Sequence, residues 1–379
     1  MVQHIYLDNA ATTRLREEVL QAMMPYLTEK YGNPSSSYGF ADVSRKAVGK
    51  ARDEVARLIG ATPGEIYFTS GGSESDNWAL KTVAENNVAK GRHIVTTAIE
   101  HHAILHTCQY LEKQGFEVTY LDVDDYGRVS PGAVRKAIRK DTVLVSVMTA
   151  NNEIGTIQPI AEIGKIAHEN GVLFHTDAVQ AFGHIPINVQ EMNIDLLSAS
   201  GHKLNGPKGI GILYAREGIT LSSFMHGGGQ ERGLRAGTLN VPGIVGMGKA
   251  AALAQTEMDS HIRQITDTRN FLINSIIEKI PGVTLNGHPE ERLPNNANLS
   301  FPGIDSRSLL ILLDQHGICA SNGSACSSSS DTSHVIQAVC HNADLAKGVI
   351  RLTLSHETTR DQIEYTVSVL QRIVEKLQA

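Results

Sequence analysis

The chain has 379 residues, 41% of them hydrophobic, which suits a folded protein with one large core and a second, smaller unit. Its 34 Lys and Arg residues against 40 Asp and Glu residues give a net charge of −6, so no overall basic field attracts nucleic acid. The first residues lack a basic leader, and no stretch approaches the ~20 apolar residues that cross a bilayer, so we expect a cytoplasmic protein without membrane contacts.

Apolar runs rich in β-branched residues alternate with helical patterns through the first two thirds of the chain. Strands are predicted at 65–68, 93–98, 143–148, 172–177, 195–200 and 209–215, with amphipathic helices between several of them, as at 74–90 and 159–171. This alternation predicts an α/β fold with a largely parallel sheet covered by helices on both faces. A long helical stretch from about 241 to 280 then leads into a smaller α+β domain, against which the N-terminal segment is expected to pack.

The segment GGSESDN follows the strand predicted at 65–68. Its small residues expose backbone N–H groups at the start of a helix, where they and the Ser73 hydroxyl can cradle a phosphate. Taken alone, the motif is better explained as a capping box, in which Ser70 or Ser73 caps the helix and Glu74 or Asp76 assists.

Two neighbouring strands end in a carboxylate and a lysine. Asp177 ends the strand at 172–177, with Gln180 three residues on, and Lys203 follows the strand at 195–200. A pyridoxal-phosphate enzyme needs this combination, because the lysine amine binds the cofactor and the carboxylate keeps its ring nitrogen protonated. Either residue alone could be a helix cap or a solvated charge, but the pair, with Ser200 and His202 beside it, indicates a cofactor site.

Histidines and cysteines supply further candidates. His102 and His106 have the i, i+4 spacing of a metal pair, but no third ligand follows, so we predict no metal site. His101 lies at a strand end, where it either stacks on an aromatic cofactor and moves protons or is a hydrogen-bonded filler residue.

Cys326 lies in the run ASNGSACSSSS, which is typical of an exposed loop where a thiol is accessible and can ionise. The alternative is an incidental surface cysteine. Cys319, between Ile318 and Ala320, is predicted to be buried and inert.

Ten segments carry a resemblance to a known family. In chain order they are YLDNAATT, YGNPSSS, TSGGSESDN, IEHH, ANNEIGT, HTDAVQ, SGHKLNGPKG, GGGQERGLRAGTLN, LSFPG and GSACSS. With these segments in register over the whole chain, it closely resembles the cysteine desulfurases of the NifS and IscS kind, class V aminotransferases with the aspartate-aminotransferase fold. The resemblance implies a seven-stranded, mostly parallel sheet in a large domain at 16–258, and a small domain formed by 1–15 and 259–379.

The same resemblance implies roles for individual residues. Lys203 would be the Schiff-base lysine of pyridoxal 5′-phosphate, Asp177 the partner of the ring nitrogen, Gln180 the neighbour of the ring hydroxyl, and His101 the stacking residue. The residues expected at the phosphate are Gly72, Ser73, Ser200, His202 and, across a homodimer interface, Thr238 of the partner subunit. Asn152 and Arg351 would bind the carboxylate of L-cysteine, and Cys326 would take its sulfur as a persulfide.

The long serine-rich loop around Cys326 resembles the first group of the family. Tyr38 and Cys340 depart from the family pattern, away from the implied chemistry. The chain ends at VEKLQA, without the tail that housekeeping members use on an iron–sulfur scaffold. The sequence leaves the sulfur acceptor open among an iron–sulfur scaffold, a nitrogenase-type scaffold, a tRNA-thiolation enzyme and a DNA-sulfur-modification partner. A selenocysteine lyase or related lyase of this fold, and a non-catalytic sulfur-relay scaffold, are the alternative functions.

Overall fold

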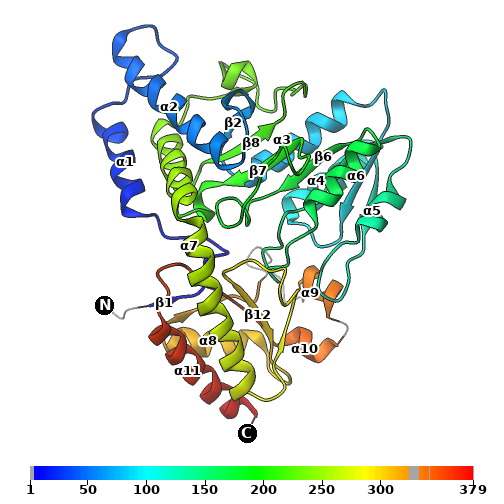
Figure 1. The fold of residues 1–379 in the computed structure, drawn as a ribbon, viewed down its shortest axis with the longest axis vertical. Coiled ribbons are helices and arrows are strands. Elements are labelled where there is room, and N and C mark those ends of the chain that lie inside the picture. Colours follow the sequence, from blue (N-terminus) through cyan, green and yellow to red (C-terminus); the bar gives the residue numbers. More distant parts are fainter. Residues whose placement is uncertain (1–3, 324–332, 341, 379) are drawn as a thin grey trace.

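The computed structural model describes residues 4–323, 333–340 and 342–378. Its largest sheet has seven strands (Figure 1). Their spatial order is β2 (Ile66–Thr69), β8 (Gly211–Ala215), β7 (Leu196–Ser200), β6 (Leu173–Asp177), β5 (Thr142–Ser146), β3 (His93–Thr97) and β4 (Glu117–Leu121). Only β8 runs against its neighbours, so the other six strands present their carboxyl ends at one edge.

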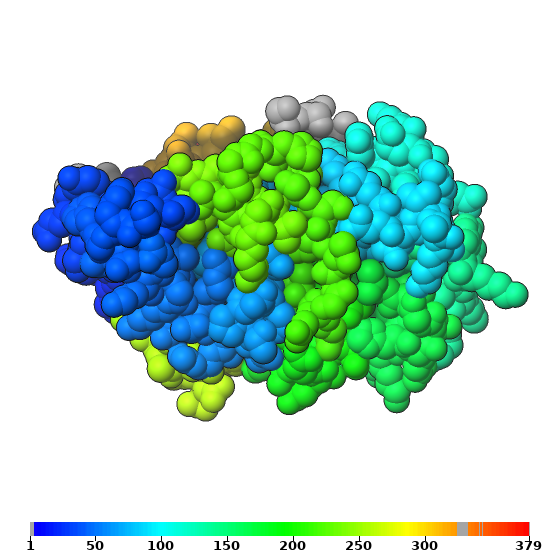
Figure 2. Space-filling view, turned by 90° about the horizontal axis from the view of Figure 1, so that it is seen from above, coloured from blue at the N-terminus to red at the C-terminus, as the bar shows by residue number. Residues whose placement is uncertain are grey.

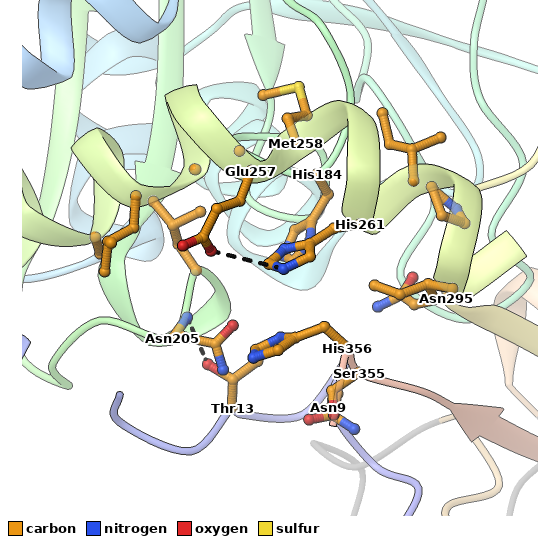
Figure 3. Close-up of a pocket in the computed structure, with 18 of the residues that line it drawn as sticks. Asn9, Thr13, His184, Asn205, Glu257, Met258, His261, Asn295, Ser355 and His356 are labelled. Carbon is orange, nitrogen blue, oxygen red and sulfur yellow. Dashed lines mark hydrogen bonds and ion pairs between the residues drawn. The ribbon is translucent and has the colours of Figure 1, made fainter. Parts of the chain in front are cut away.

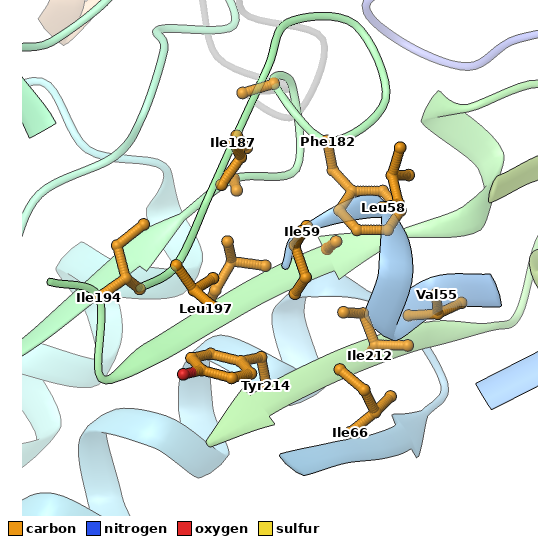
Figure 4. Packing of buried hydrophobic residues seen from close by; sticks show 14 of the residues in the cluster. Val55, Leu58, Ile59, Ile66, Phe182, Ile187, Ile194, Leu197, Ile212 and Tyr214 are labelled. Atoms are coloured by element: carbon orange, nitrogen blue, oxygen red, sulfur yellow. The ribbon is translucent and has the colours of Figure 1, made fainter. Parts of the chain in front are cut away.

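Both faces of this sheet are buried, because successive strand residues pack into different cores. Leu196 and Leu213 join a core that also holds Trp78, while Leu197, Ile212 and Tyr214 join the core on the opposite face. This period of two places the sheet between two helical layers. Figure 4 shows the core that holds Leu197, Ile212 and Tyr214, where the end of α2 packs over strands β7 and β8.

Helices cover the sheet as the alternating pattern predicts. α3 (Gly72–Asn86) packs on β5 to β8 and also contacts α4 (His102–Lys113). The remaining helices of this part are α1 (Glu17–Thr28), α2 (Gly39–Leu58), α5 (Pro131–Ala137), α6 (Ile160–Glu169) and the start of α7 (Val241–Lys279). Single 3-10 turns occur at Pro63–Glu65, Gly201–Lys203 and Glu231–Gly233. A short hairpin pairs β9 (Gly229–Gln230) with β10 (Arg235–Ala236).

A second core lies below the large sheet in Figure 1. It is built on the antiparallel strands β11 (Thr284–Leu285), β12 (Asn296–Ser300) and β14 (Val349–Thr353), and on the parallel pair β1 (Ile5–Tyr6) and β13 (Ile318–Cys319). Its helices are α8 (Ser306–Gln315) and α11 (Arg360–Gln378), whereas α9 (His334–Val339) and α10 (Ala343–Lys347) pack in a small separate cluster with Ile99 and Ile154. The pairing of β1 with β13 brings the N-terminal segment to this core, as the sequence predicts.

The long helix α7 connects the two cores. Val241 and Ile244 at its start pack in the core of the large sheet, whereas Leu272 and Ile276 near its end pack in the second core. The domain boundary expected between residues 258 and 259 falls inside this continuous helix and stays a prediction.

The sequence patterns miss one strand of the sheet. β4 lies at the edge and is only partly buried, so it lacks the continuous apolar character that marks the central strands. No helix in the described part of the chain is long and apolar enough to span a membrane.

Figure 2 shows the upper face of the molecule, where α1 and α2 lie beside the segment that joins β8 to α7. Ser35 Oγ and Gln230 Oε1 are 2.6 Å apart at this contact.

Candidate active site

A cavity of about 300 Å³ lies at the carboxyl ends of the parallel strands, where α3 and α4 begin. It brings together ten of the twelve predicted site residues: Gly72, Ser73, His101, Asn152, Asp177, Gln180, Ser200, His202, Lys203 and Arg351. Thr238 is exposed in the loop between β10 and α7 and does not line this cavity. Cys326 lies outside the described residues.

Lys203 and Asp177 reach the cavity from adjacent strands. β6 and β7 are paired in register, with Asp177 opposite Ser198, and Lys203 ends the 3-10 turn that follows β7. The Lys203 ammonium donates to the backbone oxygens of Ala10 and, at 2.7 Å, Ala11. These oxygens belong to the segment that joins β1 to α1, so a part of the chain far from Lys203 in the sequence holds the lysine in place.

Asp177 is 5% exposed and accepts a hydrogen bond from the backbone N–H of Val179 at 2.9 Å. Burial raises the pKa of Asp177, and a positive charge on Lys203 or on a protonated His101 opposes that rise. The protonated ring nitrogen of a bound cofactor, next to this carboxylate, would also lower the pKa of Asp177. Gln180 lies nearby and donates from Nε2 to the Ala10 oxygen at 3.1 Å.

The first turn of α3 forms one end of the cavity. Among the described residues no side chain caps this helix, so its leading N–H groups are available to an anion. The capping box considered from the sequence is therefore absent, and the Glu74 carboxylate instead accepts from the Ser70 N–H and pairs with Arg235. Ser200 and His202 line the same end of the cavity.

Gly72 starts α3 at a position with no space for a side chain. An ideal Cβ there would lie 2.5 Å from Cγ2 of Val179. We therefore expect Gly72→Ala to lower the free energy of unfolding by about 1–3 kcal/mol, the usual cost of overpacking, and to weaken anion binding at the α3 terminus. Urea unfolding measures this change.

Gly49→Ala is the matched control, because Gly49 lies inside α2 with no atom within 4 Å of an added Cβ. It should be neutral or stabilise by roughly 0.5–1 kcal/mol. Equal unfolding midpoints for both variants would contradict the packing argument at Gly72.

His101 is positioned by its helix terminus. Its Nδ1 accepts the backbone N–H of Ala103 at 3.1 Å, which caps α4 and leaves Nε2 as the other ring nitrogen. Burial lowers the pKa of His101, against the opposing charge of Asp177. At neutral pH the imidazole is therefore uncharged and, because Nδ1 accepts a hydrogen bond, carries its proton on Nε2, from which it can donate.

Arg351 lies on β14 and is 1% exposed. Its Nη2 bonds Oδ1 of Asp8 at 2.8 Å, and its Nη1 donates to the backbone oxygen of Asn152 at 2.9 Å. Nε of Arg351 is buried without a hydrogen-bond partner among the described residues. A buried guanidinium N–H with no acceptor is costly, and a ligand carboxylate in the cavity would satisfy it.

The sequence analysis missed several polar residues of the cavity. Asp76 and Glu100 are buried beside Asp177 and His101, and Glu153 is buried next to Arg351. Burial raises the pKa of Glu100 to about 8 although its carboxylate accepts from the Met148 N–H. Asp76 had a usable signal, since it lies one helical turn after Gly72 on the predicted helix.

The described cysteines do not enter the cavity. Cys108 is buried in the helical layer over the sheet. Cys319 was predicted to be buried, but it is only partly so, because β13 pairs with β1 alone at the edge of the second core. Cys340 is also partly exposed and its thiol contacts the backbone oxygen of Asn342 at 3.4 Å.

A smaller cavity of about 50 Å³ lies behind Lys203, between the two cores. A ring nitrogen of His184 hydrogen-bonds the Lys203 backbone oxygen at 2.8 Å. Figure 3 shows His261 on α7 facing His356, and their rings stack with centroids 4.5 Å apart. The small volume suits an ordered water and not a substrate.

The model of the aminotransferase class-V family matches residues 5–366 of the chain. The chain belongs to this family. It is 55% identical over 374 residues to the cysteine desulfurase IscS of Methanosarcina thermophila. This match covers 98% of this chain and 92% of that protein. A solved NifS-like protein superposes with a TM-score of 0.93 at 40% identity, covering 99% of this chain and 100% of the other. The solved structure of SspA in complex with cysteine superposes with a TM-score of 0.83 at 38% identity. This match covers 94% of this chain and 100% of SspA.

These neighbours confirm the predicted fold and the resemblance to the NifS and IscS kind. Class V aminotransferases are pyridoxal-phosphate-dependent, and the chain is an enzyme of that type. Its cavity fits the cofactor: the uncapped α3 terminus suits a phosphate, and Asp177 and Lys203 suit the ring nitrogen and the aldehyde.

Proposed function

We propose that this protein is a cysteine desulfurase, which converts L-cysteine to L-alanine and passes the sulfur through Cys326 to an acceptor protein. The observation that carries the proposal is one cavity in which Lys203 and Asp177 lie with the buried, incompletely paired Arg351. The first pair suits the cofactor, and the guanidinium suits the carboxylate of an amino acid. The relatives named cysteine desulfurase over the whole chain, and the cysteine-bound SspA, support cysteine as that amino acid.

Arg351 orients the substrate in this proposal. Its Nε binds the substrate carboxylate, while Asp8 and the Asn152 backbone oxygen hold the other guanidinium nitrogens in place. The Asp8 carboxylate also balances the buried positive charge of Arg351. Asn152 lines the cavity and supplies a side-chain amide to the same carboxylate.

Lys203 would hold the cofactor through its Nζ, and the same amine, when free, would accept the proton from the substrate α-carbon. Bound pyridoxal phosphate supplies an electron-accepting ring that stabilises the charge left on that carbon. Asp177 stays ionised against the ring nitrogen, and the neutral His101 moves protons at its Nε2. Gly72, Ser73, Ser200 and His202 hold the phosphate.

Cys326 is the proposed nucleophile. Its thiolate attacks the substrate sulfur, so that the carbon–sulfur bond breaks, a sulfur–sulfur bond forms, and alanine leaves after protonation of its β-carbon. The acceptor protein then takes the outer sulfur.

The direct test uses purified protein loaded with pyridoxal phosphate and supplied with L-cysteine and a thiol reductant. Alanine and sulfide should form in equal amounts over many turnovers. Turnover of selenocysteine without turnover of cysteine would replace this proposal by a selenocysteine lyase.

We also propose a homodimer in which Thr238 contacts the phosphate in the partner's site. Large apolar side chains are exposed along residues 24–43, the blue end of Figure 2: Met24, Leu27, Tyr31, Tyr38, Phe40 and Val43. An apolar group of this kind is typical of a subunit interface. The exposed position of Thr238 in a loop outside its own cavity supports the same arrangement.

Mixing two inactive variants tests the shared site. A Lys203→Ala subunit and a Thr238→Ala subunit should recombine into hybrid dimers with one native site each, giving about a quarter of wild-type activity after random exchange. A Lys203→Ala parent mixed with Lys203→Ala,Thr238→Ala is the control and should stay inactive. A fully active monomer in sizing experiments would contradict the dimer.

A further inference from the structure

Asp76 is a buried carboxyl group that the chemistry above does not use. It lies on α3, is 1% exposed and lines the cavity. Asp76, His101 and Asp177 each place a carboxylate oxygen or ring nitrogen within 4.8 Å of the others. Oδ1 of Asp76 has no hydrogen-bond partner among the described residues.

Ionising both of two carboxylates buried this close together costs much free energy, because their negative charges repel and water does not screen them. Asp177 is the better placed to keep the negative charge, because it accepts the Val179 N–H and interacts with the positive charge of Lys203. Glu100, the other carboxyl group near Asp76, is also buried, and since burial raises its pKa to about 8 it brings no positive charge that would favour an ionised Asp76.

No Lys or Arg of the described residues pairs with Asp76. His175 on β6 is fully buried, with Nε2 3.7 Å from Oδ1 of Asp76. Burial lowers the pKa of His175 to about 3, so the ring is neutral, and its nitrogens bond Ser146 Oγ at 2.9 Å and Ser198 Oγ at 3.1 Å. Ser198 is also a hydrogen-bond partner of Asp76.

We propose that Asp76 is a positioning residue that remains a neutral carboxylic acid in the folded protein and thereby leaves Asp177 as the single anion facing the cofactor ring nitrogen. The inference rests on the proposed site, but not on which amino acid is the substrate. A permanently neutral side chain of the same shape should therefore replace Asp76 with little change in the cofactor site.

Asp76→Asn tests the charge state through stability. Burial raises the pKa of Asp76, with the charge of Asp177 adding to the effect. A carboxyl group whose pKa is higher in the folded than in the unfolded state destabilises the fold progressively as pH rises from the unfolded value, near 4, to the folded value. The melting temperature of cofactor-loaded Asp76→Asn relative to wild type should thus increase with pH across that window.

Asp141→Asn is the control of opposite sign. Arg139 lowers the pKa of Asp141, so this variant should lose melting temperature relative to wild type as pH rises through the titration of Asp141. If Asp76→Asn behaves like Asp141→Asn, Asp76 is ionised in the fold and the inference is overturned, whether or not the protein desulfurates cysteine.

Two further readouts separate a charge effect from misfolding. Asp76→Asn should keep the absorbance of the bound cofactor and change its dissociation constant by less than about threefold, whereas Asp76→Ala should weaken it, since it leaves a cavity beside Asp177. Infrared spectra of wild-type protein with isotope-labelled aspartate need no variant. A protonated carboxyl band should be present at neutral pH, and its absence would overturn the inference.

Discussion

Lys203→Ala is expected to abolish the visible absorbance of the bound cofactor and to lower kcat/KM for cysteine by roughly 10³-fold or more. One atom, Nζ of Lys203, both holds the cofactor and accepts the substrate proton in the proposed chemistry. The loss should therefore appear in absorbance spectra and in alanine release together.

Lys208→Ala is the matched control, because Lys208 is an exposed lysine in the same loop and does not line the cavity. It should keep both the absorbance and the turnover. A Lys203→Ala variant that releases alanine at the wild-type rate would exclude this lysine as the cofactor's attachment point.

Cys326→Ala is expected to keep the cofactor and bind cysteine, yet to release neither alanine nor sulfide at an appreciable rate. The residues proposed to hold the ring and the carboxylate all line one cavity of the described structure. Loss of a thiol on a separate serine-rich segment should leave them intact, while removing the group that accepts sulfur. Spectral change on addition of cysteine and product assays measure the two parts separately.

Cys319→Ala and Cys340→Ala provide the comparison, since both thiols lie outside the cavity. Both variants should desulfurate cysteine at the wild-type rate. Normal activity of Cys326→Ala with loss in either of the others would identify a different nucleophile. Full activity of all three would remove the persulfide step and favour the selenocysteine-lyase alternative.

The sequence reveals the part of the site that depends on strand order. Asp177 and Lys203 each follow a buried apolar run, and the rule that ligands bind at the carboxyl ends of parallel strands places them together. The structure brings both to one cavity. Gln180, Asn152 and Arg351 had no such local signal, and only the resemblance to the desulfurases indicated them.

The contacts that complete the site join residues far apart in the chain. Arg351 pairs with Asp8, and the Lys203 ammonium donates to oxygens of the segment after β1. No local periodicity encodes such pairs, because they depend on how β1 and β14 pack in the second core. Asp76 was missed for another reason: a polar residue near the start of a helix is normally a solvated side chain, and its place one turn after Gly72 was not followed up, although the fold shows it to be buried.

The central claim, that Lys203 carries pyridoxal phosphate, is tested most directly by fixing the bound cofactor chemically. Borohydride reduction of the cofactor-loaded protein, followed by digestion and mass spectrometry, should place the phosphopyridoxyl group on the peptide and side chain of Lys203. Its recovery on Lys208 or any other lysine, or the absence of any modified lysine in protein that turns over cysteine, would contradict the account.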